Sequence, residues 1–131
     1  MPFNRREFIA SIGAGAAALA LPVDASHGVT KMYGLIGKMR ATPGQRDALI
    51  SILLDGVSSM PGCLSYVVAQ DPGDADAIWI TEVWDNQANH KASLSLPSVR
   101  DAITNAKPLI AGFDEHIETQ PVGGHGIPAA A

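Results

Sequence analysis

The residues best suited to chemistry lie close together between positions 77 and 90. An apolar segment, 77–84, ends in Glu82-Val83-Trp84, and a polar turn then leads to His90. His90 is a candidate general base, because the pKa of an unperturbed histidine is close to neutral. Trp84 and Trp79 could stack against a ring-shaped substrate. This segment therefore predicts an aromatic pocket with a proton-accepting group beside it.

Three further residues are candidate substrate contacts, namely Tyr33, Tyr66 and Glu82. The two tyrosines lie on segments that we expect to be neighbouring strands. Glu82 shares a strand face with Trp84, because side chains two residues apart point the same way. Glu82 could also orient His90 or pair with a lysine, and the alternative is an ordinary charge at a sheet edge or interface. The aromatic residues could equally be plain core or interface residues.

The composition indicates one domain and excludes several classes of site. The chain has 131 residues and a net charge of −4 without a basic stripe, so we expect no nucleic-acid partner. The one cysteine, Cys63, rules out an internal disulfide, and the isolated histidines lack metal-ligand spacing, so no metal site is expected. His116 falls on the polar side of the last predicted strand, which favours a surface residue. A Gly-x-Ser-x-Gly hydrolase motif is absent from the sequence.

The first 25 residues are typical of a twin-arginine export leader. Arg5-Arg6 precedes a mildly apolar run, 9–21, and the sequence Val23-Asp24-Ala25 offers a cleavage site after Ala25. We therefore expect a periplasmic protein whose contact with the membrane is limited to its leader, the alternative being an uncleaved anchor or arm. The Gly- and Ala-rich segment 13–18 has the residue types of a dinucleotide-binding motif. It is not expected to bind a dinucleotide, because no strand precedes it.

The rest of the chain alternates strand and helix patterns in the order β-α-β-β-α-β. We expect strands at 31–40, 63–70, 77–84 and 112–119, and helices at 43–57, 86–96 and from 97 onward. Thr42 and Gln45 predict a capping box at the first helix start. This order is typical of an α+β fold, the ferredoxin-like split βαβ sheet, over residues 31–120. Residues 121–131 read as a flexible C-terminal tail.

Both faces of the predicted sheet contain apolar side chains. Ile78 and Ile80 point to one face, whereas Trp79 and Val83 point to the other. A sheet of this type has helices on one face only, and one small domain cannot cover both faces. We therefore expect a second copy of the chain to cover the other face, giving a homodimer.

Several segments, taken in order, resemble the antibiotic biosynthesis monooxygenase superfamily, and in particular its quinol monooxygenases. The segments that resemble the family are 41–44, 60–66, 80–84, 90–99 and 107–113. The resemblance implies a dimeric α+β barrel made of two ferredoxin-like subunits. It also implies an enzyme that oxidises a quinol or related phenol with molecular oxygen and no bound cofactor.

The sequence departs from the haem-degrading branch of that superfamily. The residues that align with the Asn, Trp and His of that branch are Gly37, Leu94 and Thr104, so we do not expect haem degradation. Many other members have a histidine one helical turn after His90, where this chain has Ser93. We therefore predict a cofactor-independent monooxygenase with His90 as its base. The alternative is a non-catalytic periplasmic dimer of the same fold that binds a small molecule or acts in a stress response.

Overall fold

Four strands and three α-helices make up the computed structural model, which describes residues 31–57 and 59–129. The predicted leader, 1–25, lies outside the described residues. The elements in chain order are β1 (Tyr33–Ala41), α2 (Arg46–Gly56), β2 (Cys63–Gln70), β3 (Ala77–Trp84), α3 (Gln87–Ser93), α4 (Pro97–Ala106), the short 3₁₀ turn η3 (Lys107–Leu109) and β4 (Ile110–Thr119). None of the described helices is long and apolar enough to cross a membrane.

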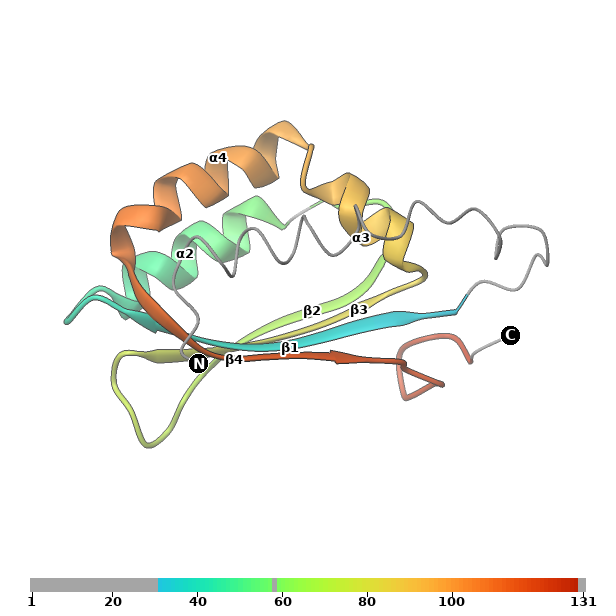
Figure 1. Cartoon of the computed structure of the whole chain (residues 1–131), viewed down its shortest axis with the longest axis horizontal. Coiled ribbons are helices and arrows are strands. Elements are labelled where there is room, and N and C mark those ends of the chain that lie inside the picture. Colours follow the sequence, from blue (N-terminus) through green and yellow to red (C-terminus); the bar gives the residue numbers. More distant parts are fainter. Residues whose placement is uncertain (1–30, 58, 130–131) are drawn as a thin grey trace.

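The strands form one antiparallel sheet in the order β2-β3-β1-β4. Helices α2, α3 and α4 lie on the same side of this sheet (Figure 1). The predicted ferredoxin-like α+β fold is confirmed. The expectation that Tyr33 and Tyr66 lie on neighbouring strands is wrong, because β3 separates β1 from β2.

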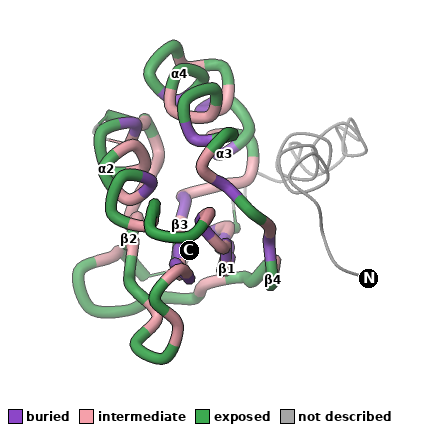
Figure 2. Tube along the Cα trace, turned by 90° about the vertical axis from the view of Figure 1, so that its left-hand side faces the viewer, coloured by how far each residue is buried: buried purple, intermediate pink, exposed green. Residues whose placement is uncertain are grey.

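The core lies between the sheet and the helices, where Figure 2 shows most of the buried segments. Leu49 of α2 and Ile78 of β3 have 0% of their surface exposed, and Phe113 of β4 packs in the same cluster. Each fully buried side chain of this kind stabilises the fold by about 1.5–3 kcal/mol. The opposite face of the sheet is only partly buried in one chain, with Val67 52% and Ile117 45% exposed.

Helix α2 begins later than the sequence predicted. Thr42 was expected to cap it, but the cap position is Gln45, and no side chain accepts a hydrogen bond there. The reason is Gly44, whose φ of 78° is incompatible with a helical residue. The turn is held instead by two backbone N–H groups: that of Thr42 donates to the carbonyl of Leu109 at 2.8 Å, and that of Gly44 donates to Asp76 Oδ1 at 3.2 Å.

Three register shifts, two in the β1–β4 pair and one in the β2–β3 pair, change which side chains face the helices. In β4 the partner of Lys38 is Glu115 but the partner of Met39 is Phe113, so Asp114 is an extra residue in the strand. In β2 a similar shift at Leu64 brings Cys63 onto the same face as Tyr66. A bulge reverses the alternation of side chains beyond it. The strict alternation assumed from the sequence is therefore wrong where these shifts occur.

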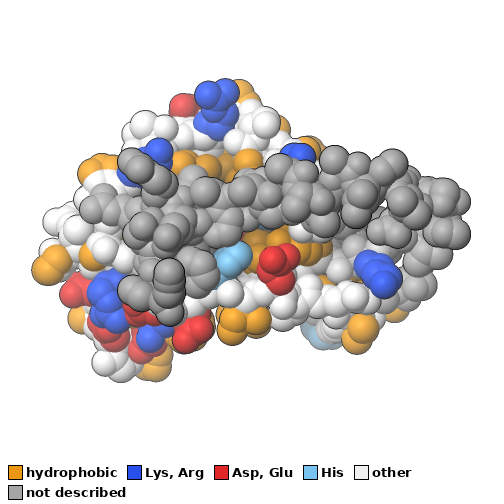
Figure 3. All heavy atoms as spheres, viewed as in Figure 1, with side chains coloured by type: hydrophobic (Ala, Val, Ile, Leu, Met, Phe, Trp, Pro, Cys, Tyr) orange, Lys and Arg blue, Asp and Glu red, His pale blue; other side chains and the backbone are white. Residues whose placement is uncertain are grey.

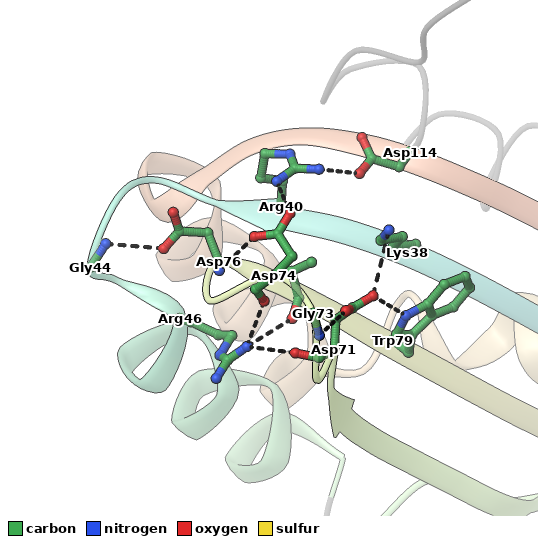
Figure 4. A network of polar contacts seen from close by, with 11 residues as sticks. Lys38, Arg40, Gly44, Arg46, Asp71, Gly73, Asp74, Asp76, Trp79 and Asp114 are labelled. Atoms are coloured by element: carbon green, nitrogen blue, oxygen red, sulfur yellow. Dashed lines mark hydrogen bonds and ion pairs between the residues drawn. The ribbon is translucent and has the colours of Figure 1, made fainter.

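Charged side chains of both signs gather at the end of the sheet where β2 turns into β3 (Figure 3). Figure 4 shows the contacts there: Arg40 pairs with Asp74 and with Asp114, and one Arg46 nitrogen donates to the carbonyls of Asp71, Asp74 and Ala77 at 2.8–3.4 Å. Surface ion pairs such as those of Arg40 contribute little to stability, because solvent screens them. This network fixes the hairpin loop at the opposite end of β3 from Trp84.

Candidate active site

The end of β3 and the following helix bring the candidate residues together. Alternation along β3 directs Glu82 and Trp84 to the helix side of the sheet. Asn86 then caps α3, because its Oδ1 accepts a hydrogen bond from the backbone N–H of Asn89 at 2.7 Å. The first turn of α3 thereby directs His90 back toward the strand end.

A cavity of about 300 Å³ lies between the sheet and the three helices. Its wall is mainly apolar and includes residues from all four strands. The ionisable or aromatic residues in the wall are Tyr66, Glu82, Trp84, His90, Phe113 and His116. Small-molecule pockets in proteins usually measure roughly 300–1,000 Å³, so the cavity has room for a small ring-containing ligand.

His90 is buried rather than on the surface, with 3% of its area exposed. Its ring centroid lies 5.2 Å from that of Tyr33 and 5.4 Å from that of Trp84, whose plane is nearly perpendicular to it. Burial lowers the pKa of His90 to about 4; Glu118 opposes this shift and His116 adds to it. The imidazole is therefore neutral at pH 7.

Glu82 is the other ionisable group of interest in the wall. The indole Nε1–H of Trp84 donates a hydrogen bond to its Oε1 at 3.0 Å. Burial raises the pKa of Glu82 to about 7, and the bond from Trp84 opposes that shift. This carboxyl group can therefore gain or lose a proton near neutral pH.

The two tyrosines occupy different places. Tyr66 lies in the cavity wall, opposite Glu82 across the β2–β3 pair, and burial raises its pKa far above the usual range. Tyr33 is outside the lining and packs on His90 instead. Burial and a hydrogen bond with Glu118 raise the pKa of Tyr33 as well, so both phenols stay protonated at neutral pH.

Trp79 is separated from the other candidates. It points to the opposite face of the sheet, where its Nε1–H donates to Asp71 Oδ2 at 2.9 Å and the Lys38 ammonium lies 5.3 Å from its ring. A substrate in the cavity cannot touch it. The strand alternation seen in the sequence already indicated that Trp79 and Trp84 face different sides.

His116 was missed as a cavity residue. The sequence interpretation assigned it to the polar side of β4, whereas the structure places it in the cavity wall, opposite Gly37 of β1. The extra residue Asp114 causes the difference, because Phe113 and His116 would otherwise face opposite sides. A bulge of this kind leaves no clear signal in the local sequence.

Within the two described ranges, the structure contains no group of three or more His, Cys, Asp or Glu side chains that could hold a metal ion. At the positions that align with the haem-degrading residues, Gly37 and Leu94 line the cavity and Thr104 is exposed. None of the three side chains offers a nitrogen ligand for haem iron.

Comparisons with known proteins agree with this architecture. A crystal structure from Chloroflexus aurantiacus J-10-fl, named a "putative antibiotic biosynthesis monooxygenase", is 79% identical in sequence. It superposes with a TM-score of 0.73 over 74% of this chain and 99% of that chain. The structure of PA3566 from Pseudomonas aeruginosa has a TM-score of 0.64 at 20% identity, covering 72% of this chain and 98% of that one. At such low identity the similarity concerns the fold alone.

A protein from Caulobacter crescentus CB15 that bears the same name as the Chloroflexus protein has a TM-score of 0.61 at 15% identity, covering 78% of this chain and 99% of that chain. No functionally curated protein matches the chain. The family model of antibiotic biosynthesis monooxygenases matches residues 32–105, which is more than half of the sequence. The chain therefore belongs to the antibiotic biosynthesis monooxygenase family, and this membership supports a monooxygenase-like function.

Proposed function

We propose that this protein is a cofactor-independent monooxygenase that oxidises a quinol or another electron-rich aromatic compound with molecular oxygen. The observation that supports this most is the cavity, which combines an apolar wall, the rings of Trp84 and Tyr66, and a carboxyl group that titrates near pH 7. An apolar cavity with a few convergent polar groups is the usual form of a small-molecule site.

The proposed reaction balances without an added reductant. A quinol and O₂ give a hydroxylated quinone and one water molecule. One oxygen atom bonds to a ring carbon, and the other leaves as water with two hydrogens from the quinol. The quinol supplies all four electrons that reduce O₂.

The residues of this chain would assist in two ways. Removing the hydroxyl proton makes the ring a better electron donor to oxygen, and a base beside the ring promotes that step. The apolar wall excludes water while the radical pair exists. His90, which lies against Trp84, can hydrogen-bond a bound ring as a neutral imidazole. We expect His90→Ala to lower turnover roughly tenfold or more.

We further propose that the protein acts as a homodimer in the periplasm. The partly exposed face of the sheet contains Ile36, Val67, Val83 and Ile117, which form an apolar surface suited to a second copy. The export leader that predicts the periplasm precedes the described residues. A non-catalytic dimer that binds a small molecule would use the same cavity, so only activity separates the two functions.

Oxygen uptake tests the proposal. Purified protein is mixed with a panel of naphthols and quinols in the presence of a chelator and with no added flavin. We expect uptake above the spontaneous rate for at least one compound, reduced in His90→Ala. Absence of uptake for the whole panel would favour the binding-protein alternative, which a ligand titration would then test.

A further inference from the structure

Glu82 lies in the part of the cavity wall that the sheet provides. It pairs with Leu35 of β1 on one side and with Tyr66 of β2 on the other. Along β3 its neighbours on the same face are Ile80 and Trp84. All five residues line the cavity. A single carboxyl group thus lies in a row of apolar and aromatic side chains.

The lining offers this carboxylate little compensation for its burial. Among the described lining residues there is no lysine or arginine. The bond from Trp84 Nε1–H reaches only one of the two carboxylate oxygens, Oε1. A desolvated charge without a cation destabilises the fold, and an apolar residue would be at least as stable at such a position. Glu82 is only partly exposed and is strongly desolvated; a carboxylate of this kind that faces a cavity is a candidate for a chemical role.

We infer that Glu82 is the catalytic residue that accepts the substrate's hydroxyl proton, and that it selects neutral hydroxylated rings by accepting their hydroxyl hydrogen bond. The inference rests on the proposed function and extends it to a residue and a substrate class. In this step the O–H bond of the substrate breaks and the proton bonds to a carboxylate oxygen of Glu82. The electron pair stays on the ring oxygen. The proton later leaves with the water formed from O₂.

The charge states of the two candidate bases agree with this assignment. The pKa of Glu82, about 7, is close to the pH at which the protein would work, where a base is most effective. The pKa of His90, about 4, makes its imidazole a weak proton acceptor. The inference therefore moves the role of base from His90, where the sequence suggested it, to Glu82.

The other titratable groups around Glu82 come from four elements. They are Tyr33 on β1, Cys63 and Tyr66 on β2, His90 on α3, and His116 and Glu118 on β4. Burial raises the pKa of the Cys63 thiol, so the thiol and both phenols stay protonated at neutral pH. Helices α2 and α4 contribute only apolar residues and Gly56 to the described lining. A comparison of Glu82 with Gln therefore isolates the carboxylate.

Binding of 2-naphthol under nitrogen tests the inference without relying on oxygen chemistry. A hydroxyl group binds an ionised carboxylate more strongly than a protonated one, so affinity should rise roughly tenfold as pH rises through 7. The glutamine of Glu82→Gln keeps an oxygen that can accept the hydrogen bond from Trp84, but this side chain cannot ionise. The affinity of the variant for 2-naphthol should therefore not vary with pH. Glu82→Asp retains a carboxylate, so its affinity for 2-naphthol should still rise with pH. Glu115→Gln makes the same change on the opposite face of β4 and should behave as wild type.

The methyl ether 2-methoxynaphthalene is the matched ligand, because it has the same rings and no hydroxyl proton. Its affinity should not rise with pH. The inference is overturned if Glu82→Gln keeps the wild-type pH dependence, if the ether shows the same rise as 2-naphthol, or if neither compound binds.

Oxygen uptake by the same variants separates this inference from the proposed function. If the binding results are as expected but no compound is oxidised, the proposed function fails, whereas Glu82 stands as the acceptor of the hydroxyl group. If wild-type protein consumes oxygen and Glu82→Gln does so at an equal rate, the proposed function stands and Glu82 is not the base. We expect Glu82→Gln to reduce uptake at least roughly tenfold.

Discussion

At the scale of single residues, the contributions of Glu82 and His90 to stability depend on pH in opposite directions. The folded-state pKa of Glu82 is raised from 4.5 to about 7, so its contribution is full below pH 4.5 and is lost as pH rises toward 7. The folded-state pKa of His90 is lowered from 6.5 to about 4, so its contribution is full above pH 6.5 and is lost as pH falls toward 4. The two effects oppose each other between these limits.

Single variants should separate these contributions. The free energy of unfolding of Glu82→Gln, relative to wild type, should rise with pH from 4.5 to about 7, because only wild type loses stability there. The free energy of unfolding of His90→Gln, relative to wild type, should rise as pH falls from 6.5 to about 4. Urea unfolding at a series of pH values measures both. Differences that do not vary with pH would show that these groups do not titrate as the structure implies.

Most of the candidate site could be predicted from residue spacing, and its errors have physical causes. Glu82, Trp84, Tyr66 and His90 meet at one cavity because β3 alternates regularly and α3 follows it after a short turn. The burial and the lowered pKa of His90 depend on packing against Tyr33 and Trp84, which no local pattern reveals.

At the scale of elements, Gly56 determines how closely α2 approaches α4. A Cβ atom at Gly56 would lie 2.5 Å from Cβ of Ala102. Alanine favours a helix by about 1 kcal/mol over glycine, but the collision should outweigh this and destabilise Gly56→Ala by roughly 1–3 kcal/mol. Thermal or urea unfolding measures the effect. Adding Ala102→Gly should restore most of the loss, whereas a stabilised Gly56→Ala would contradict the packing described.

The cap of α3 links local structure to the site. Asn86→Ala removes the acceptor for the Asn89 N–H and should destabilise the protein by about 0.5–2 kcal/mol. Because α3 holds His90, we also expect weaker binding of 2-naphthol. Asn105→Ala, at an exposed position of α4, is the matched control and should change neither property appreciably. Equal effects of the two substitutions would argue against the cap.

The elements were more predictable than their side-chain orientations. Strands β2 and β3 have the predicted bounds, because each is an apolar run between Gly- or Asp-rich turns. The start of α2 was misplaced by the left-handed conformation of Gly44, and the face of His116 by the bulge at Asp114. Both depend on contacts with distant segments, such as the bond from Gly44 to Asp76.

At the scale of the whole molecule, the proposed dimer rests on the apolar outer face of the sheet. Ile117 lies opposite Ile36 in the β1–β4 pair and is 45% exposed in one chain. Ile117→Glu should convert the proposed dimer to single chains, because it would bury a charge in the interface. Leu54→Glu adds the same charge at a similarly exposed residue of α2 and should leave the mass unchanged. Sedimentation at micromolar concentration measures the mass; a wild-type protein with the mass of one chain would contradict the dimer.

The most direct test of the central claim is the fate of isotopically labelled oxygen. Purified protein is supplied with ¹⁸O₂ and a quinol that it consumes, with a chelator present and no flavin. The account predicts a hydroxylated quinone that contains one labelled oxygen atom, with the second label in water. An unlabelled quinone accompanied by hydrogen peroxide would show simple oxidation instead of oxygenation, and would contradict the account.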